Sequence, residues 1–162
     1  MTVHWPRITA LLFGLCLMSC GPSGMRPEQG INSALQRSAE SRRWPSMGNR
    51  WLASVTSRNG RERVELVNLR NGQPVPLPGI NQADAQPISV SVSADGTRIA
   101  LVRSRDGRTE LMLYRRGVGM LQRLPLEPAG VPREVSLDGS GRLLAVQVSR
   151  QGRWDVDLIR LP

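Results

Sequence analysis

The fold of this chain is decided by residues 98–114, which read RIALVRSRDGRTELMLY. An apolar run is followed by the polar pair Asp106-Gly107 and then by a segment in which polar and apolar residues alternate. Asp-Gly between two such segments is a strong signal of a β-hairpin, because both central positions of a type I′ turn need positive φ. The stretch therefore predicts two antiparallel strands joined by a two-residue turn.

The same pattern occurs three times. Aligned on Ala53, Ala100 and Ala145, the copies are 47 and 45 residues apart, and the turns that follow the alanines read SRNGR, SRDGR and SRQGR. Each copy has a glycine seven residues after its alanine, at Gly60, Gly107 and Gly152. A repeat of about 45 residues that holds several short strands indicates the blades of a β-propeller or a similar array.

The second repeat serves as the template for the others. Its alternating segments predict four antiparallel strands at 88–93, 98–104, 109–115 and 120–124, which together make one propeller blade. The first repeat predicts strands at 50–57, 64–69 and 73–78, after a less regular strand around 43–46. The third repeat predicts strands at 133–137, 142–150 and 154–161 and no fourth strand. Residues 30–36 alternate weakly and are the candidate for the missing strand.

Prolines give an independent check on the first repeat. Pro74, Pro76 and Pro78 alternate along its fourth predicted strand, so their missing N–H groups all lie on one side of that strand. Such a strand can pair on its other side only. We therefore expect it at the edge of a sheet, as the outermost strand of a blade.

The predicted fold class is all-β, with three consecutive four-stranded antiparallel blades of which the last is incomplete. Closed propellers usually have four to eight blades. The chain is therefore expected to be half of a dimeric six-bladed ring, part of another assembly, or an open three-bladed wedge. Twelve strands in three repeats are also compatible with a β-trefoil, which stays open as an alternative.

The start of the chain has the features of an export signal. Residues 8–18 form an apolar run of 11 residues behind a short basic segment, too short to span a bilayer, which needs about 20 residues. The run ends in LMSCG at residues 17–21, which resembles the lipobox of bacterial lipoproteins, where the cysteine is lipidated. We expect a signal peptide at 1–19, a lipidated Cys20, a flexible tether at 20–41 and a repeat domain at 42–162, with repeats at 42–87, 88–131 and 132–162. An ordinary cleaved signal or an uncleaved anchor is the alternative.

The repeat itself resembles that of a known family. Asp95-Gly96, Ile99-Ala100, Arg105-Asp106-Gly107 and residues 111–114 have the spacing of the blade repeat of TolB-like β-propellers, and the three copies cover residues 41–162. Together with the lipobox, the chain is similar to small TolB-like envelope lipoproteins of bacteria. The resemblance implies a membrane-anchored protein that faces the periplasm and binds or scaffolds other envelope components. TolB also has an N-terminal α/β domain that is not seen here, so contacts made through that domain are not implied.

Catalytic residue types are scarce. His4 and Cys16 lie in the predicted signal peptide, so the mature chain has no histidine and only Cys20, which rules out Ser-His-Asp, Cys-His and His/Cys zinc sites. We expect no enzyme activity, cofactor or metal. Asp155 and Asp157 face the same side of one strand, so a protein that binds or processes envelope glycans stays an alternative. Pairing of the strand carboxylates with arginines across the sheet is the simpler interpretation.

Arginine supplies every basic residue of the chain, which carries a formal charge of +9. Two arginines flank each repeated turn, at Arg58 and Arg61, Arg105 and Arg108, and Arg150 and Arg153. They either bind an anionic envelope protein or polymer, since guanidinium binds carboxylate and phosphate in bidentate fashion, or simply solubilise the turns. Nucleic acid is not an expected partner, because the signal directs export and stacking aromatics are few.

Overall fold

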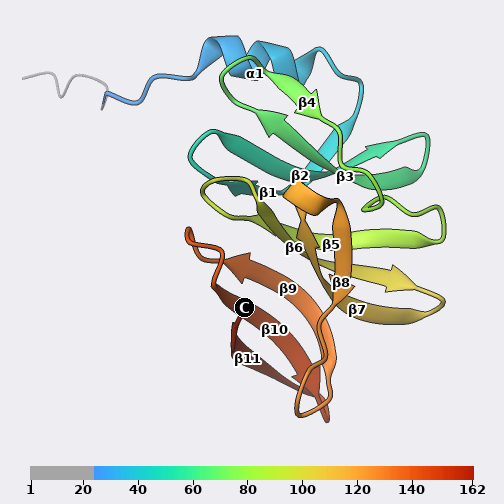
Figure 1. The fold of residues 1–162 in the computed structure, drawn as a ribbon. Coiled ribbons are helices and arrows are strands. Elements are labelled where there is room, and N and C mark those ends of the chain that lie inside the picture. Colours follow the sequence, from blue (N-terminus) through green and yellow to red (C-terminus); the bar gives the residue numbers. More distant parts are fainter. Residues whose placement is uncertain (1–23) are drawn as a thin grey trace, which may run out of the picture.

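The three sequence repeats form three separate antiparallel sheets. The structure, a computed structural model, describes residues 24–162, so the predicted signal peptide and Cys20 lie outside the described residues. Helix α1 (Gln29–Gln36) precedes the sheets, which stack in chain order (Figure 1). Within this part of the chain no helix has the length and hydropathy needed to cross a membrane.

Each sheet corresponds to one predicted blade. Blade 1 contains β1 (Ser41–Met47), β2 (Trp51–Arg58), β3 (Arg61–Asn68) and β4 (Gln73–Val75). Blade 2 contains β5 (Ala85–Val92), β6 (Arg98–Arg105), β7 (Arg108–Arg115) and β8 (Met120–Arg123), with the short 3-10 helix η1 (Arg116–Val118) before β8. Blade 3 contains β9 (Val131–Leu137), β10 (Leu143–Arg150) and β11 (Arg153–Arg160).

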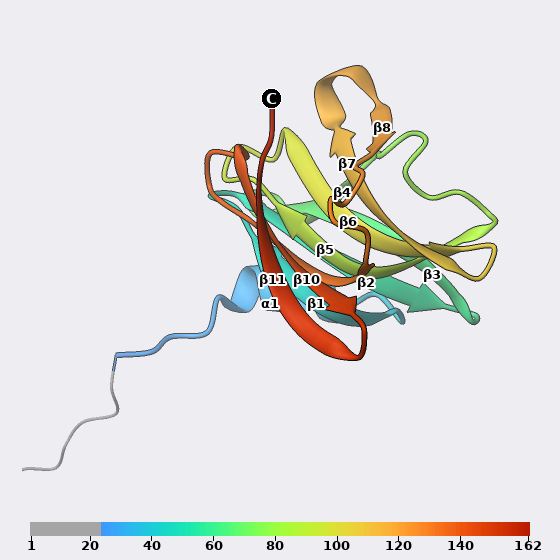
Figure 2. The same cartoon turned by 90° about the horizontal axis from the view of Figure 1, so that it is seen from below.

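This topology confirms the all-β class and the three blades. Strands pair in chain order within each sheet, and among the described residues blade 3 has three strands, as the third repeat predicts. The β-trefoil alternative is wrong, because the described strands of each repeat pair only with one another, in a separate sheet. Figure 2 shows the twisted sheets from below, arranged as an open array.

The three hairpin turns have the predicted backbone conformation. The first turn residues Asn59, Asp106 and Gln151 have φ values of 52°, 50° and 51°, and the glycine that follows each of them also has a positive φ. Positive φ at both positions is the signature of the type I′ turn. The sequence repeat is therefore a repeat of this turn.

The proline-rich strand lies at a sheet edge, as predicted. β4 is the outermost strand of blade 1 and pairs only with β3. Its ladder covers residues 73–75 rather than the expected 73–78. Pro76 and Pro78 cannot donate backbone hydrogen bonds, which explains why the strand is this short.

The strand expected at residues 30–36 is wrong. These residues belong to α1, because Ile31, Ala34 and Leu35 have the i, i+3, i+4 spacing of one helical face and are the half-buried residues of the helix. The helix lies on blade 1, where a Cβ added to Gly72 would come within 2.8 Å of the Ala34 Cβ. Residues 30–36 therefore do not complete blade 3, and part of the segment expected to be a tether is helical.

The core lies between blades rather than within one. One face of blade 1 packs on blade 2 in a cluster that includes Val55, Leu66, Leu101 and Tyr114. The other face of blade 2 packs on blade 3 in a second cluster, which includes Ala100, Val102, Leu111, Leu113, Leu144, Val146 and Val148. Each blade is thus stabilised by burial against its neighbour.

Candidate anion-binding site at the arginine turns

The six arginines predicted from the repeats lie in pairs across the hairpin turns. Arg58 faces Arg61, Arg105 faces Arg108, and Arg150 faces Arg153 as direct partners in the strand registers. Like charges placed directly opposite each other destabilise a sheet. Each pair of arginines is therefore expected to need a nearby negatively charged group.

In blade 3 the counter-charge comes from the blade itself. The Arg150 guanidinium donates to both carboxylate oxygens of Asp157, at 3.0 and 2.5 Å, and to the Pro128 carbonyl at 2.9 Å. Arg153 Nε lies 3.1 Å from Asp155 Oδ1. The hydrogen bond from Arg150 lowers the pKa of Asp157 below its usual value. The aspartate pair of β11 thus serves as cross-strand counter-ions.

In blade 2 only one of the two arginines is paired. Arg105 Nη2 lies 2.6 Å from Asp84 Oδ2, and its Nε lies 3.8 Å from Asp106 Oδ2. Arg108 is exposed and forms no ion pair with any of the described residues. This turn therefore carries one neutralised and one free guanidinium group.

In blade 1 neither turn arginine is neutralised. Arg58 and Arg61 are exposed and have no carboxylate within 4.0 Å among residues 24–162. Together with Asn59, Arg63 and Asn81 they line a hollow of about 580 Å³. Arg63 Nη2 lies 2.5 Å from Glu40 Oε1, so one of the three guanidinium groups is paired. The hollow keeps an excess of positive charge.

A loop residue fixes one wall of this hollow. The side-chain amide of Asn81 accepts a hydrogen bond from the Val64 N–H at 2.7 Å and donates one to the Val64 carbonyl at 2.9 Å. The loop after β4 is thereby held against β3, beside the three arginines. Guanidinium groups around a concave site can bind phosphate or carboxylate in bidentate fashion.

Besides the turn residue Asn59, two residues of this hollow were not predicted as site residues. Arg63 lies two positions after Arg61 on the same strand, so the period-2 pattern of a strand would have placed both side chains on one face. Asn81 reaches the site from the loop after β4, and no sequence pattern predicts its position there. The structure brings Arg58 and Arg61 together with these two residues, whereas the arginines of blades 2 and 3 line no part of the hollow.

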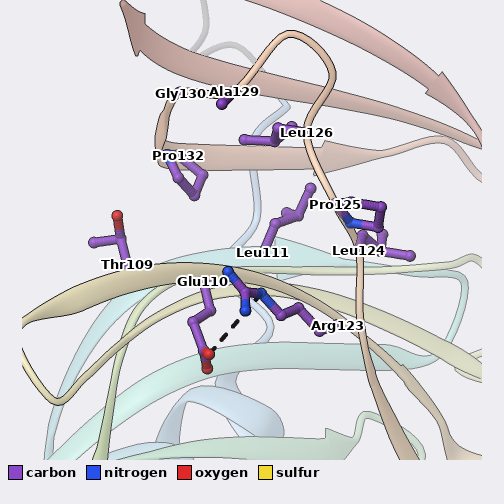
Figure 3. A pocket seen from close by; sticks show the side chains of 10 residues that line it. All are labelled: Thr109, Glu110, Leu111, Arg123, Leu124, Pro125, Leu126, Ala129, Gly130 and Pro132. Atoms are coloured by element: carbon purple, nitrogen blue, oxygen red, sulfur yellow. Dashed lines mark ion pairs between the residues drawn. The ribbon is translucent and has the colours of Figure 1, made fainter.

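A second hollow lies between blades 2 and 3 and has a volume of about 350 Å³ (Figure 3). Most of the residues that line it are apolar, and its one carboxylate, Glu110, points toward Arg123 at 4.0 Å. Glu110 Oε2 also accepts a hydrogen bond from Arg103 Nε at 2.9 Å. A glycosidase needs two carboxylates across the scissile bond, which this hollow does not offer. In the described part of the chain no three His, Cys, Asp or Glu residues cluster as a metal site.

Similarity to known proteins is found among solved structures and not among sequences. No protein-family model matches the sequence, and no curated protein matches it either. TolB from Acinetobacter baumannii superimposes with a TM-score of 0.56 and 18% identity, over 72% of this chain and 29% of that chain. The chain has the fold of part of a TolB-like β-propeller.

Two further structures are similar to this chain and also have the β-propeller fold. A putative TolB from Agrobacterium tumefaciens matches with a TM-score of 0.54 and 18% identity, over 68% of this chain and 39% of that chain. The β-propeller domain of the Trilobed protease from Pyrococcus furiosus, described as having an open velcro topology, matches with a TM-score of 0.51 and 14% identity, over 76% of this chain and 43% of that chain. The chain spans less than half the length of each of these three structures.

Proposed function

We propose that this chain is a non-enzymatic, lipid-anchored binding module of the bacterial cell envelope, which faces the periplasm and binds an anionic group of another envelope component. The binding site is the hollow of blade 1. The observation that carries the proposal is that Arg58 and Arg61 face each other beside Arg63, with no carboxylate of residues 24–162 within 4.0 Å of either. A bound anion would relieve the repulsion between them, which makes its binding favourable.

The site favours phosphate or carboxylate groups on a protein or polymer. Two of its guanidinium groups come from the two ends of one hairpin turn, and both arginines are exposed, so a large ligand has access. The glycan-processing alternative is less well supported, because Asp155 and Asp157 are engaged by Arg150 and Arg153. The resemblance to TolB-like lipoproteins and the lipobox support the envelope location.

Binding of short-chain polyphosphate tests the proposal. Arg61→Ala should weaken binding about tenfold, whereas Arg108→Ala, at the equivalent exposed position of blade 2, should leave the affinity within about twofold. Ion-paired contacts weaken as salt screens them, so the affinity of the native chain should fall steeply with ionic strength. Equal losses in the two variants would show that the turns act only as a diffuse positive charge.

The anchor is tested separately. Mass analysis of the chain extracted from membranes should find acyl groups on Cys20, and Cys20→Ser should release the protein from the membrane. Each buried CH₂ contributes about 0.8 kcal/mol, so that two or more acyl chains anchor a protein stably. Cys16→Ser, within the predicted signal peptide, is the matched control and should stay anchored. An unmodified N-terminus at another residue would contradict the lipoprotein assignment.

A further inference from the structure

The outward face of blade 3 repeats the positions that the other two blades use to pack on each other. We define this face by Ser136 on β9, Ala145 on β10, and Trp154, Val156 and Leu158 on β11. In the repeat, Ala145, Val156 and Leu158 correspond to residues that are buried between blades, namely Ala53, Val64 and Leu66 in blade 1 and Ala100, Leu111 and Leu113 in blade 2.

In blade 3 the same positions are open. Val156 is 68% exposed, Leu158 is 69% exposed and Trp154 is 56% exposed. Among residues 24–162 no further sheet covers them. Three large apolar side chains on one face of a strand are unusual on the surface of a protein that acts alone.

A serine repeat marks the same surface. Ser46 Oγ of blade 1 accepts a hydrogen bond from the Val92 N–H of blade 2 at 3.0 Å, and Ser91 Oγ of blade 2 accepts one from the Leu137 N–H of blade 3 at 2.9 Å. Ser136 is the next serine in this series, 45 residues after Ser91. It is exposed, and no donor from the described residues reaches it. Blade 3 therefore carries the polar and the apolar parts of an interface between sheets.

The other end of the stack is different. The face of blade 1 that is turned away from blade 2 carries the polar residues Ser54, Thr56 and Glu65. Arg42 donates hydrogen bonds to Glu65 Oε2 at 2.9 Å and to the Leu35 carbonyl of α1 at 3.0 Å. Met47, at the end of β1, is 71% exposed on this face, but among the described residues the face has no row of exposed apolar side chains like that of β11. Two copies joined head to tail, as in a six-bladed ring, would place the apolar face of blade 3 on this polar, helix-covered end.

We propose that the outward face of blade 3 docks on the same face of a second copy of this chain, with the twofold axis close to Val156. A twofold contact requires a surface that is complementary to itself, and an apolar centre meets that requirement. The rim carries both signs of charge, Arg160 on β11 and Glu134 on β9, so each can lie opposite the other across the axis. Two sheets would then pack face to face, about 10 Å apart.

The position of the face favours a protein partner over the membrane. Figure 1 shows α1 at one end of the stack of sheets and β11 at the other. The chain enters the domain from the predicted lipid anchor through α1, so the face of blade 3 lies at the far end. This inference is independent of the arginine hollow of blade 1 and does not rest on it.

A cysteine crosslink in the full chain tests the contact. Val156→Cys places a thiol beside the proposed axis, so mild oxidation of intact cells should give a disulfide-linked dimer of twice the chain mass on a non-reducing gel. Val118→Cys is the matched control, since Val118 is 73% exposed but lies on blade 2, and it should remain monomeric. Both variants keep Cys16 and Cys20, so the control also reports any crosslinking through these residues.

Charged substitutions at Leu158 provide a second test of the contact between the two copies. In the Val156→Cys chain, either Leu158→Arg or Leu158→Glu should lower the crosslinked fraction at least tenfold, and co-expression of the two should restore it. Both variants should keep the melting temperature of the parent, because Leu158 is largely exposed. A crosslinked fraction no higher than that of Val118→Cys would overturn the proposal. Crosslinking to a protein of different mass, or burial of position 156 in lipid, would overturn it as well.

Discussion

Single residues at the hairpin turns hold backbone conformations that few side chains tolerate. Gly107 has a φ of 71° and follows Asp106 at 50°. Asn, Asp and Gly are favoured there, whereas a β-branched residue at positive φ is strained. The turns were the most predictable part of the fold, because the positive φ that they require depends on only two adjacent residues.

We expect Gly107→Val to lower the free energy of unfolding by roughly 1–3 kcal/mol. A Cβ at this position would meet no atom within 4 Å, so the cost comes from the backbone alone. Gly117→Val is the control, because Gly117 also has open space around it but no positive φ. Urea unfolding of the two variants measures the difference. Equal stabilities would contradict the type I′ turn.

Asp138 predicts a pH dependence at the turn between β9 and β10. A hydrogen bond from the Ser140 side chain, with further bonds from the Leu143, Arg142 and Ser140 N–H groups, lowers the pKa of Asp138 from 3.8 to about 2. A carboxylate whose folded pKa lies below its unfolded value stabilises the fold above the unfolded value, and this contribution is lost as the pH falls through the folded value.

Asp138→Asn should therefore melt at a lower temperature than the native chain at about pH 6, and the difference should shrink as the pH falls from about 4 to about 2. Asp106→Asn is the control, since Asn59 already occupies the equivalent turn position in blade 1. Thermal melting across this pH range checks the prediction. A difference that is constant with pH would show that Asp138 acts through its shape rather than its charge.

At the scale of the strands, alternation predicted most elements, and the misses have physical causes. Residues 30–36 alternate weakly, but the spacing of Ile31, Ala34 and Leu35 also fits a helix, and packing on blade 1 decided between the two. The hollow of blade 1 was predicted only in part. Arg58 and Arg61 were found from the repeat, whereas Asn81 depends on a loop path that local sequence does not encode.

A buried ion pair connects neighbouring strands in blade 2. Arg103 on β6 is 4% exposed, and its guanidinium donates to Glu110 on β7 and to Gln82, each at 2.9 Å. Glu110→Ala would leave this buried cation without its carboxylate, and we expect a loss of roughly 3–5 kcal/mol in the free energy of unfolding.

Glu134→Ala provides the comparison for Glu110→Ala. Glu134 lies exposed on β9 and forms no ion pair with the described residues, so we expect a change below about 0.5 kcal/mol. Chemical denaturation of both variants measures the contrast. Similar losses would mean that Arg103 finds another partner or water when Glu110 is removed.

At the scale of the whole molecule, the three blades form an open stack with unlike ends. One end is polar and covered by α1, and the other presents the apolar face of blade 3. The repeat predicted the number of blades and the order of their strands. It did not predict this asymmetry, because the helix and the polar face of blade 1 lie outside the repeated pattern.

The charge of the molecule is also unevenly neutralised. Blade 3 supplies carboxylates for both of its turn arginines, Asp84 in the loop before β5 pairs with one arginine of blade 2, and blade 1 supplies no carboxylate for Arg58 and Arg61. Six equivalent arginines in the sequence thus become one candidate site in the structure. We propose that this site in blade 1 binds an anionic group.

The most direct test follows the arginine side chains themselves by NMR. In the ¹⁵N-labelled chain titrated with pyrophosphate, the Nε–H signals of Arg58, Arg61 and Arg63 should shift together along one binding curve. The signals of Arg108 and Arg153 should stay in place. Shifts of equal size at all exposed arginines, or no shift at Arg58 and Arg61, would contradict anion binding in the hollow of blade 1.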